Sequence, residues 1–305
     1  MTFRQSRITD NLRLRARVLQ AIREFFTIND FLEVETPVRI PAPAPEANID
    51  AVKSEDWYLQ TSPELCMKRL LAAGYDRVFQ ICRCFRGRER GEKHLPEFTL
   101  LEWYGAGFDY QDLMKQTEML IQLTAGCAGK EGTWDYRGHP INTDASWTQM
   151  TVAESFDRYA SLSMQKALET GRFDECMGLE IEPRLGFENP VFLYDYPVEM
   201  GALARQKAGN PLVAERFELY ICGLELCNGF SELTDPAEQR ERFQTELEHR
   251  QKTGREMYPM PEKFLKSLSS MPSCAGNALG VDRLIMLLTD TDQVDDVVAF
   301  TPEEL

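Results

Sequence analysis

Two apolar segments on either side of a highly charged one constrain the fold of this chain most strongly. Residues 77–86 read RVFQICRCFR and residues 98–106 read FTLLEWYGA, and both are rich in apolar and aromatic side chains. Runs of this length and composition are typical of β-strands. Because residues 87–97 between them are mostly charged or polar, the pattern predicts two strands joined by a long charged loop. The two-residue period of a strand then places Glu102 and Tyr104 on the same face.

Apolar spacing and end signals predict the main helices. Residues 10–28 carry apolar side chains at helical spacing. In TSPELCMKRLLAAGY (61–75), Ser62 suits the N-cap, Pro63 the first helical position and Gly74 the C-terminal stop. Further helices are predicted near residues 110–125, after Thr151, and from Asp235 to Gly254.

The remaining segments alternate strand and loop signals. FLEVETP (31–37) predicts a strand, and PVRIPAPAPEANID (37–50) an extended loop. ERFELYICGLELCNGFSEL (215–233) has strand character, with Asn228-Gly229 as its turn signal. CAGNALGVDRLIMLLTD (274–290) predicts a glycine-interrupted strand that runs into an apolar helix. Because no repeat or linker marks a second domain, we expect a single α+β domain over residues 1–305.

Charge and cysteine usage limit the partners and the compartment. The chain has 34 Lys and Arg against 49 Asp and Glu, a net charge of −15 at pH 7. Most of such a surface repels polyphosphate, so a nucleic acid would need a local basic patch. The N-terminus has no apolar signal core, and no run of about 18 apolar residues could span a membrane. The eight cysteines form no CxxC pair and are interpreted as buried thiols, which favours the cytoplasm.

Three acidic residues lie among apolar neighbours. Glu218, Glu225 and Glu232 follow one another at intervals of seven within or beside predicted strands. Two interpretations remain open, because these side chains form either the exposed face of a sheet or a cation site. Mg²⁺ carried by phosphates takes one or two carboxylates, and an acidic pocket also suits an ammonium group.

Two basic segments complete this pattern. The loop from Arg86 to His94 is either a solvated hairpin tip or a phosphate-binding loop. Arg86 directly follows an apolar strand, where a fixed guanidinium can bind a phosphate through two hydrogen bonds. The glycines of GNALGVDR (276–283) lie at a strand-to-helix junction with Arg283 just inside the helix, so a planar ligand can approach the backbone there.

Together, the acidic and basic segments predict a nucleotide triphosphate site. Two arginines from distant segments, an acidic metal site and a glycine-lined slot would surround the ligand. The site is not a P-loop, because the chain contains no GxxxxGK[ST] sequence. The Gly-rich loop and HRD segment of protein kinases are also absent from the sequence.

The same segments resemble a known family. FLEVETPV, RVFQICRCFRGRE with HLPEFTLLEWY, and GNALGVDRL are similar to motifs 1, 2 and 3 of the class II aminoacyl-tRNA synthetases. TSPELCMKRLL and GLELCNGFSEL narrow the resemblance to the lysyl branch, and it covers nearly the whole chain. The resemblance implies an α+β fold with an antiparallel β-sheet flanked by helices, and a homodimer formed through motif 1.

The resemblance also implies how ATP is bound. Arg86 would hold the α-phosphate and the amino acid's carboxylate, and Arg283 would hold the γ-phosphate. His94 and Phe98 would bracket the triphosphate and the adenine, with Phe98 stacking on the base. Further ATP contacts are expected from Gly87, Arg88, Glu89, Leu95, Glu225, Leu226 and Gly280.

The amino acid and the metal are assigned in the same way. The distal ammonium of lysine would contact Glu102, Tyr104 and Glu232, and the other amine end would be held by Ser62, Pro63 and Glu64. Mg²⁺ would be bound by Glu218 and Glu225. Ala278 stands where motif 3 usually has glycine, and a methyl-sized change shifts substrate preference by roughly 1–3 kcal/mol. We therefore expect Ala278 to favour one amine position over another.

Motif 2 departs from the family pattern at three positions. The family usually reads Phe-Arg-Asn-Glu, whereas this chain has Gly87-Arg88 after Arg86, with Glu89 one residue late. Leu95 replaces an asparagine that contacts ATP in the family. Either Glu89 reaches the adenine, or the adenine is held by stacking and by the backbone.

Two features resemble one group within the lysyl branch. The motif 1 helix begins close to Met1, so an N-terminal OB-fold that reads an anticodon is not expected, and motif 3 carries Ala278. Both features are similar to the ligases that attach (R)-β-lysine to a lysine of translation elongation factor P. The resemblance implies an ATP-dependent, AMP-forming ligase for (R)-β-lysine or lysine, with elongation factor P as acceptor and no tRNA. Two alternatives stay open: a truncated lysyl-tRNA synthetase with another acceptor, and a non-catalytic amino-acid-binding paralogue.

Overall fold

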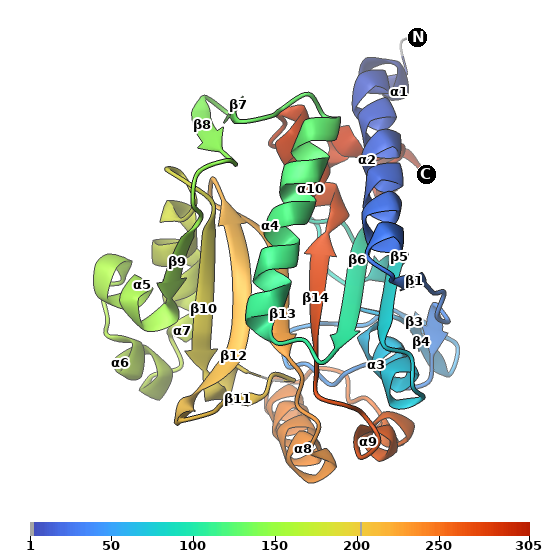
Figure 1. Cartoon of the computed structure of the whole chain (residues 1–305). Coiled ribbons are helices and arrows are strands. Elements are labelled where there is room, and N and C mark those ends of the chain that lie inside the picture. The colour runs from blue at the N-terminus through green and yellow to red at the C-terminus, as the bar shows by residue number, and fades with distance from the viewer. Residues whose placement is uncertain (1–2, 202) are drawn as a thin grey trace.

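The computed structural model describes residues 3–201 and 203–305 and is built around one large sheet (Figure 1). The strands of this sheet are β1 (Leu32–Glu33), β5 (Arg77–Phe85), β6 (Glu97–Ala106), β9 (Thr148–Thr151), β10 (Val191–Pro197), β11 (Gln206–Lys207), β12 (Asn210–Ile221), β13 (Leu224–Ser231) and β14 (Cys274–Gly280). Two small sheets contain β2 (Arg39–Ile40), β3 (Lys53–Ser54) and β4 (Trp57–Leu59), and β7 (Thr133–Tyr136) and β8 (His139–Asn142).

The large sheet is antiparallel except at its margins. Its strand order is β1-β5-β6-β14-β13-β12-β10-β9, with β11 paired to β12. Every pair from β5 to β10 is antiparallel, whereas β1 and β9 run parallel to their neighbours. The α+β fold class with an antiparallel sheet is therefore confirmed. The strand predicted over residues 31–37 is shorter than expected and is limited to β1.

Helices cover one face of the sheet and its lower end. The helices are α1 (Arg4–Arg7), α2 (Thr9–Ile28), α3 (Glu64–Ala72), α4 (Tyr110–Cys127), α5 (Val152–Tyr159), α6 (Met164–Glu169), α7 (Phe173–Cys176), α8 (Pro236–Lys252), α9 (Glu262–Leu268) and α10 (Val281–Thr289). Figure 1 shows α4 lying across the sheet with α2 beside it, and α8 and α9 below the sheet. No helix in the described part of the chain combines the length and apolarity needed to cross a bilayer.

The two faces of β6 divide the core from the site. Trp103 is fully buried and donates its Nε1–H to Gln116 of α4 at 3.1 Å, so this face packs against the helices. Burying an aromatic side chain of this kind contributes about 1.5–3 kcal/mol. Glu102 and Tyr104 point to the other face, where the Tyr104 hydroxyl donates to the Glu102 carboxylate at 2.7 Å. The sequence prediction that these two side chains share a face is confirmed.

The hairpin of β12 and β13 corrects one sequence prediction. Its turn is Cys222-Gly223, whose φ angles are 49° and 69°, and not Asn228-Gly229. Asn228 and Gly229 lie inside β13, paired with β14. A Cβ at Gly229 would lie 2.6 Å from the Phe217 ring, so glycine is required there for packing rather than for a turn.

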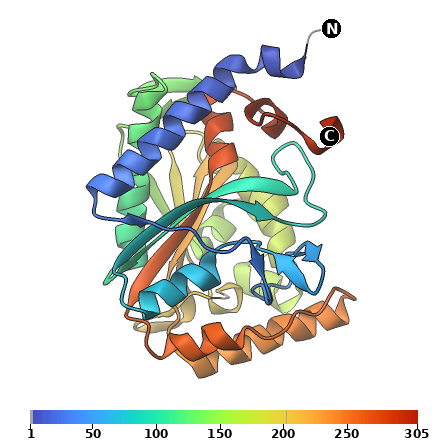
Figure 2. The ribbon, with the colours of Figure 1, turned by 90° about the vertical axis from the view of Figure 1, so that its right-hand side faces the viewer.

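One polar cluster joins the segments that resemble motifs 1, 2 and 3. Arg15 of α2 donates to the Asp282 carboxylate of α10 at 2.6 Å and to the Thr99 hydroxyl of β6 at 2.7 Å. The Thr99 amide also donates to Asp282, at 2.8 Å. Arg15 and Asp282 are both largely buried, so each charge requires the other as a partner. In Figure 2 the loop that joins β5 and β6 extends away from α4.

Candidate active site

A cavity of about 410 Å³ lies on the sheet face that carries Glu102 and Tyr104. Residues far apart in the chain line it, from Glu46 in the loop before β3 to Val294 after α10. Most residues predicted from the sequence belong to this lining: Ser62, Glu64, Arg86, Glu89, His94, Leu95, Phe98, Glu102, Tyr104, Glu218, Glu225, Leu226, Ala278, Gly280 and Arg283.

Four residues predicted for the site are not among the described residues that line this cavity. Arg88 lines a smaller recess of the charged loop, and its φ is 67°. Pro63 and Gly87 line neither the cavity nor the recess, and Glu232 is fully buried beside it. Gly87 instead donates its amide N–H to the Asp50 carbonyl at 2.6 Å, and a Cβ there would lie 3.3 Å from that oxygen. Glycine at this position thus permits two loops to approach each other closely.

Arg86 lies at the end of β5 with part of its hydrogen-bonding capacity unused. Its guanidinium carbon is 5.0 Å from the centroid of the Phe98 ring, which is within the range of a cation–π contact. Its Nη1 is 4.0 Å from the Glu89 carboxylate, so Glu89, which comes one residue later than in the family pattern, lies within ion-pair distance of Arg86. Its Nε is buried and has no hydrogen-bond acceptor among the described residues. A buried donor without an acceptor is costly and rare, which favours a ligand atom as its partner.

A second cationic centre forms where three segments meet. Arg283 donates to the Glu225 carbonyl at 2.8 Å and to its carboxylate at 3.1 Å, and it contacts His94 Nε2. Burial lowers the pKa of His94 to about 4, and the positive charges of Arg283 and Arg86 act in the same direction. The imidazole is therefore neutral at pH 7 and can accept a hydrogen bond from Arg283.

On the acidic side of the cavity, Glu218 and Glu225 have a third carboxyl group, Glu182, as a neighbour outside the cavity lining. Glu218 accepts hydrogen bonds from the hydroxyls of Tyr196 and Tyr220, both at 2.6 Å, and from Arg216. Burial, and then repulsion from Glu218 and from Glu225 of β13, raises the pKa of Glu182 to about 7. Among residues 3–201 and 203–305, no group of three or more His, Cys, Asp or Glu side chains is arranged to hold a metal ion.

The opposite end of the cavity is a buried acidic pocket. Glu102 accepts hydrogen bonds from the Ser62 hydroxyl at 2.6 Å and from the Tyr104 hydroxyl at 2.7 Å. Burial raises the pKa of Glu102 to about 7, and repulsion from Glu64 adds to the effect, whereas the two hydroxyls oppose it. An ammonium group bound here would stabilise the ionised form of Glu102.

A lysine of the chain itself lies behind this pocket. The Lys68 ammonium is almost fully buried and bridges the carboxylates of Glu64, at 2.5 Å, and Glu232. Burial raises the pKa of Glu232 to about 8, although Lys68 opposes the shift. The cation next to Glu232 in this structure is therefore Lys68, and a contact of Glu232 with a substrate stays a prediction.

Proton release provides a test of the acidic pocket. Binding of a diamino acid places an ammonium near Glu102, which lowers its pKa, so a proton leaves the protein wherever Glu102 was protonated before binding. We expect affinity to rise as the pH rises through about 7 and to level off above it. Calorimetric titration with a diamino acid, at a pH about one unit below that pKa and in buffers of different ionisation enthalpy, should report proton release. Release that is absent, or that is not reduced in Glu102→Gln, would contradict this assignment.

Sequence reasoning missed several charged residues of the site, among them Arg216, Glu46 and Lys68. Arg216 and Glu46 line the cavity, and Lys68 lies behind it. Arg216 alternates with Glu218 along β12, so the strand period could have placed both on one face. Lys68 follows Glu64 by four residues in α3, which is a spacing at which helical side chains meet. Glu46 lies in a loop, where no sequence period applies.

Comparison with known proteins identifies the family of the chain. Residues 1–304 match the family of class II tRNA synthetases (D, K and N), and the chain belongs to this family. It is 37% identical over 321 residues to the elongation factor P–(R)-beta-lysine ligase of Salmonella gallinarum, covering 98% of this chain and 97% of that protein. It is 38% identical over 306 residues to the ligase of the same name from Vibrio cholerae, covering 95% and 94%.

A lysine–tRNA ligase is similar over a smaller part of its length. The chain is 35% identical over 319 residues to the enzyme of Magnetococcus marinus, covering 96% of this chain but only 64% of that protein. The resemblance to the class II synthetases and their lysyl branch that the motifs indicated is therefore confirmed.

Proposed function

We propose that this protein is an ATP-dependent, AMP-forming ligase. It activates (R)-β-lysine or lysine as an aminoacyl adenylate and transfers it to the ε-amine of a lysine on elongation factor P. The observation that carries this proposal is one cavity with Arg86, whose Nε lacks an acceptor among the described residues, and the buried acidic pocket around Glu102. The guanidinium of Arg86 suits a phosphate and a carboxylate, and the acidic pocket suits an ammonium. The names of the Salmonella and Vibrio relatives support the same reaction.

The first step forms the adenylate. An oxygen of the amino acid's carboxylate attacks the α-phosphorus of ATP, the bond to the bridging oxygen breaks, and pyrophosphate leaves with the electron pair. Arg86 stabilises the charge that develops on the α-phosphate, and Arg283 binds the terminal phosphate. Phe98 stacks on the adenine, and neutral His94 lies beside the triphosphate as a hydrogen-bonding group rather than a cation.

Mg²⁺ is the metal that the acidic side of the cavity fits. Among residues 3–201 and 203–305, Glu225 shares its carboxylate only with Arg283, and Glu218 accepts three hydrogen bonds, so both retain lone pairs for a cation. Mg²⁺ binds through one or two carboxylates together with phosphates, so a cluster of three protein ligands is not required. Glu218 and Glu225 repel the nearby Glu182 carboxyl, which adds to the effect of burial on its raised pKa, and a cation would offset this repulsion. When bound, the metal neutralises phosphate charge.

The second step transfers the aminoacyl group. The neutral ε-amine of the acceptor attacks the carbonyl carbon, a carbon–nitrogen bond forms, AMP leaves, and the amine proton passes to water. Arg86 holds the phosphate of the departing AMP. We propose that the charged loop between β5 and β6 faces the acceptor, because it borders the cavity through Glu89, Lys93 and His94.

Ala278 is the proposed determinant of amine position. It lies in β14, directly opposite Glu102 on one side and Asn228 on the other. Its methyl group therefore borders the acidic pocket, where the two amines of lysine and β-lysine must fit. A contact of this size discriminates by roughly 1–3 kcal/mol.

ATP–pyrophosphate exchange tests the proposed function. We expect exchange to be stimulated most by (R)-β-lysine, less by lysine and not without an amino acid, and we expect Ala278→Gly to narrow the difference. Elongation factor P should then become aminoacylated at a lysine. Aminoacylation of tRNA would instead favour the synthetase alternative, which the Magnetococcus relative supports. Binding of an amino acid without exchange would favour the non-catalytic paralogue.

The domain, assembly and compartment are proposed on separate grounds. We propose one catalytic domain over residues 1–305, acting in the cytoplasm, because all eight cysteines are free thiols. We also propose a homodimer through the motif 1 segment, where Ile28, Leu32 and Val38 are 80%, 50% and 41% exposed. Sedimentation equilibrium that gives a monomer at micromolar concentration would contradict the dimer.

A further inference from the structure

Glu46 places a carboxylate in the wall of the cavity, and this carboxylate has no partner among the residues that the structure describes. It lies in the loop between β2 and β3 and lines the cavity together with Glu64 and Arg86. Its carboxylate forms no hydrogen bond or ion pair with any other residue that the structure describes. Burial raises the pKa of Glu46 to about 7; Arg86 opposes the shift, and Glu64 adds to it. A carboxylate in such a place is unfavourable unless a cation pairs with it.

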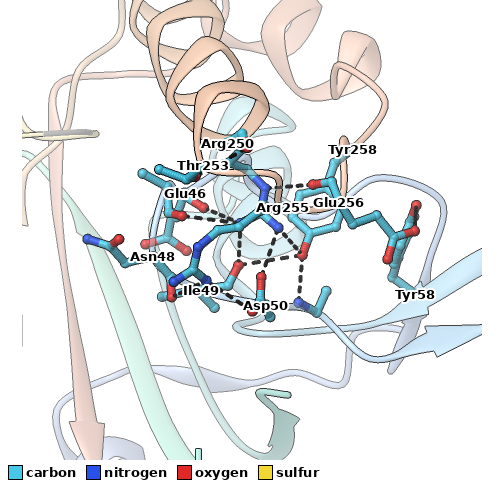
Figure 3. Close-up of polar contacts among 12 residues, drawn as sticks. Glu46, Asn48, Ile49, Asp50, Tyr58, Arg250, Thr253, Arg255, Glu256 and Tyr258 are labelled. Atoms are coloured by element: carbon cyan, nitrogen blue, oxygen red, sulfur yellow. Dashed lines mark hydrogen bonds and ion pairs between the residues drawn. The ribbon is translucent and has the colours of Figure 1, made fainter. Parts of the chain in front are cut away.

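A buried arginine fixes the loop that carries Glu46 (Figure 3). Arg250 of α8 has no exposed surface, and its guanidinium carbon lies 4.2 Å from the centroid of the Tyr258 ring. It donates to the backbone carbonyls of Glu46 at 2.8 Å and Ile49 at 2.7 Å, and to the Asp50 carboxylate at 3.0 Å. These bonds occupy the backbone carbonyl of Glu46 and not its side chain, so the carboxylate is left for the cavity.

Two more residues hold the same loop. Arg255 donates to the second carboxylate oxygen of Asp50 at 2.9 Å and to the Asn48 carbonyl at 3.3 Å. Glu246 of α8 accepts the Ala47 amide N–H at 2.6 Å. The loop is therefore fixed along residues 46–50 by side chains of α8 and of the segment after it. A binding group on a loop fixed in this way loses little freedom when it meets its ligand.

The loop is also attached at the reacting end of the cavity. The Asp50 carbonyl accepts the Gly87 amide N–H at 2.6 Å, directly after Arg86. Glu46 is thereby fixed relative to the guanidinium that would hold the substrate carboxylate. Glu64 shares its carboxylate with Lys68, whereas Glu46 shares its carboxylate with no described residue. Of these two acids, Glu46 has the more available charge for an ammonium close to the reacting carboxylate.

We propose that Glu46 is a specificity-determining residue that binds the substrate amino group nearest to the reacting carboxylate. Arg250 and Arg255 are positioning residues that hold the loop carrying Glu46 in place. This inference rests on the proposed function and adds to it, because it names the substrate class. Ligands that carry one amine near the carboxylate and one at the distal end satisfy Glu46 and Glu102 together. Acids with only the distal amine leave Glu46 unpaired.

Calorimetric dissociation constants for three ligands test the role of Glu46. Lysine and (R)-β-lysine carry both amines, and 6-aminohexanoic acid lacks the one near the carboxylate. A hydrogen bond to a charged group is worth enough that Glu46→Gln should weaken binding of the diamino acids roughly tenfold to a hundredfold. The affinity for 6-aminohexanoic acid should stay unchanged. Glu55→Gln, at an exposed ion pair with Arg39, is the matched control and should alter none of the three constants.

Positioning is tested at Arg255, because loss of the buried Arg250 guanidinium can unfold the chain. Arg255→Gln should weaken diamino-acid binding but not the binding of 6-aminohexanoic acid, and Arg255→Lys should restore it in part. If Arg255→Gln weakens the binding of all three ligands equally, Arg255 has a structural role only and the positioning claim is overturned. Unchanged dissociation constants in Arg255→Gln would overturn it as well.

Outcomes in the unmodified protein separate the two proposals. If it binds diamino acids and supports exchange, but Glu46→Gln leaves the ratio between lysine and 6-aminohexanoic acid unchanged, the role of Glu46 is wrong and the proposed function stands. If the unmodified protein binds no diamino acid, both fail.

Discussion

Replacement of Arg86 by alanine is expected to remove adenylate formation while leaving the fold intact. The side chain lies at the end of β5, is 28% exposed, and has a buried Nε without an acceptor among the described residues. Removing one donor aimed at developing charge typically slows catalysis by about 10²–10³-fold. We expect ATP–pyrophosphate exchange to fall by at least this factor, and the urea midpoint of unfolding to change little.

Arg83→Ala is the matched control for this prediction. Arg83 lies on the same strand, is 51% exposed, and pairs with Glu97 at 3.7 Å, away from the cavity lining. Exchange should persist in this variant. Exchange that survives in Arg86→Ala, in a protein that still binds ATP, would show that another cation stabilises the α-phosphate.

Replacement of Lys68 by methionine is expected to cause a large loss of stability, much larger than replacement of an exposed lysine. The Lys68 ammonium is 1% exposed and lies between the carboxylates of Glu64 and Glu232. Removing one partner of a buried ion pair leaves an uncompensated charge and typically costs about 3–5 kcal/mol. We expect the free energy of unfolding in urea at pH 8 to fall by about this amount.

A second variant and a control make the Lys68 prediction specific. Lys68→Met combined with Glu232→Gln should recover part of the stability, because the unpaired charge is then gone. Lys115→Met removes a 75% exposed ammonium that pairs with Asp112, and should change stability by less than about 0.5 kcal/mol. Equal losses in the Lys68 and Lys115 variants would mean that the buried ion pair contributes nothing particular.

The sequence predicted those parts of the site that depend on local signals. The strand period of β6 placed Glu102 and Tyr104 on one face, and the strand-to-helix junction placed Arg283 at the start of α10. The caps at Thr151 and Gly74 were confirmed for the same reason, because each depends on a few neighbouring residues. The family motifs supplied the rest, since they brought distant segments into one expected site.

The sequence did not predict features that depend on tertiary packing. Lys68 has the pattern of an ordinary helical lysine, and its burial depends on distant residues: Glu232, directly after β13, and the rings of Phe230 and Phe264. Asn228-Gly229 is a strong turn signal, yet the Phe217 ring occupies the space where a side chain at Gly229 would lie. Glu46 belongs to a Pro/Ala-rich loop, and its place in the cavity depends on Arg250 of α8.

The cluster of Arg15, Thr99 and Asp282 has a consequence for how the protein is made. Its ion pair joins residues 267 positions apart in sequence, and Arg283 follows Asp282 directly. When the ribosome has synthesised β5 and β6, the nascent chain therefore contains Arg86 but not yet α10, which carries Arg283. Contacts of such long sequence separation form late in folding. We expect nascent chains that end before α10 to lack adenylate chemistry, so ATP is not consumed by an incomplete enzyme.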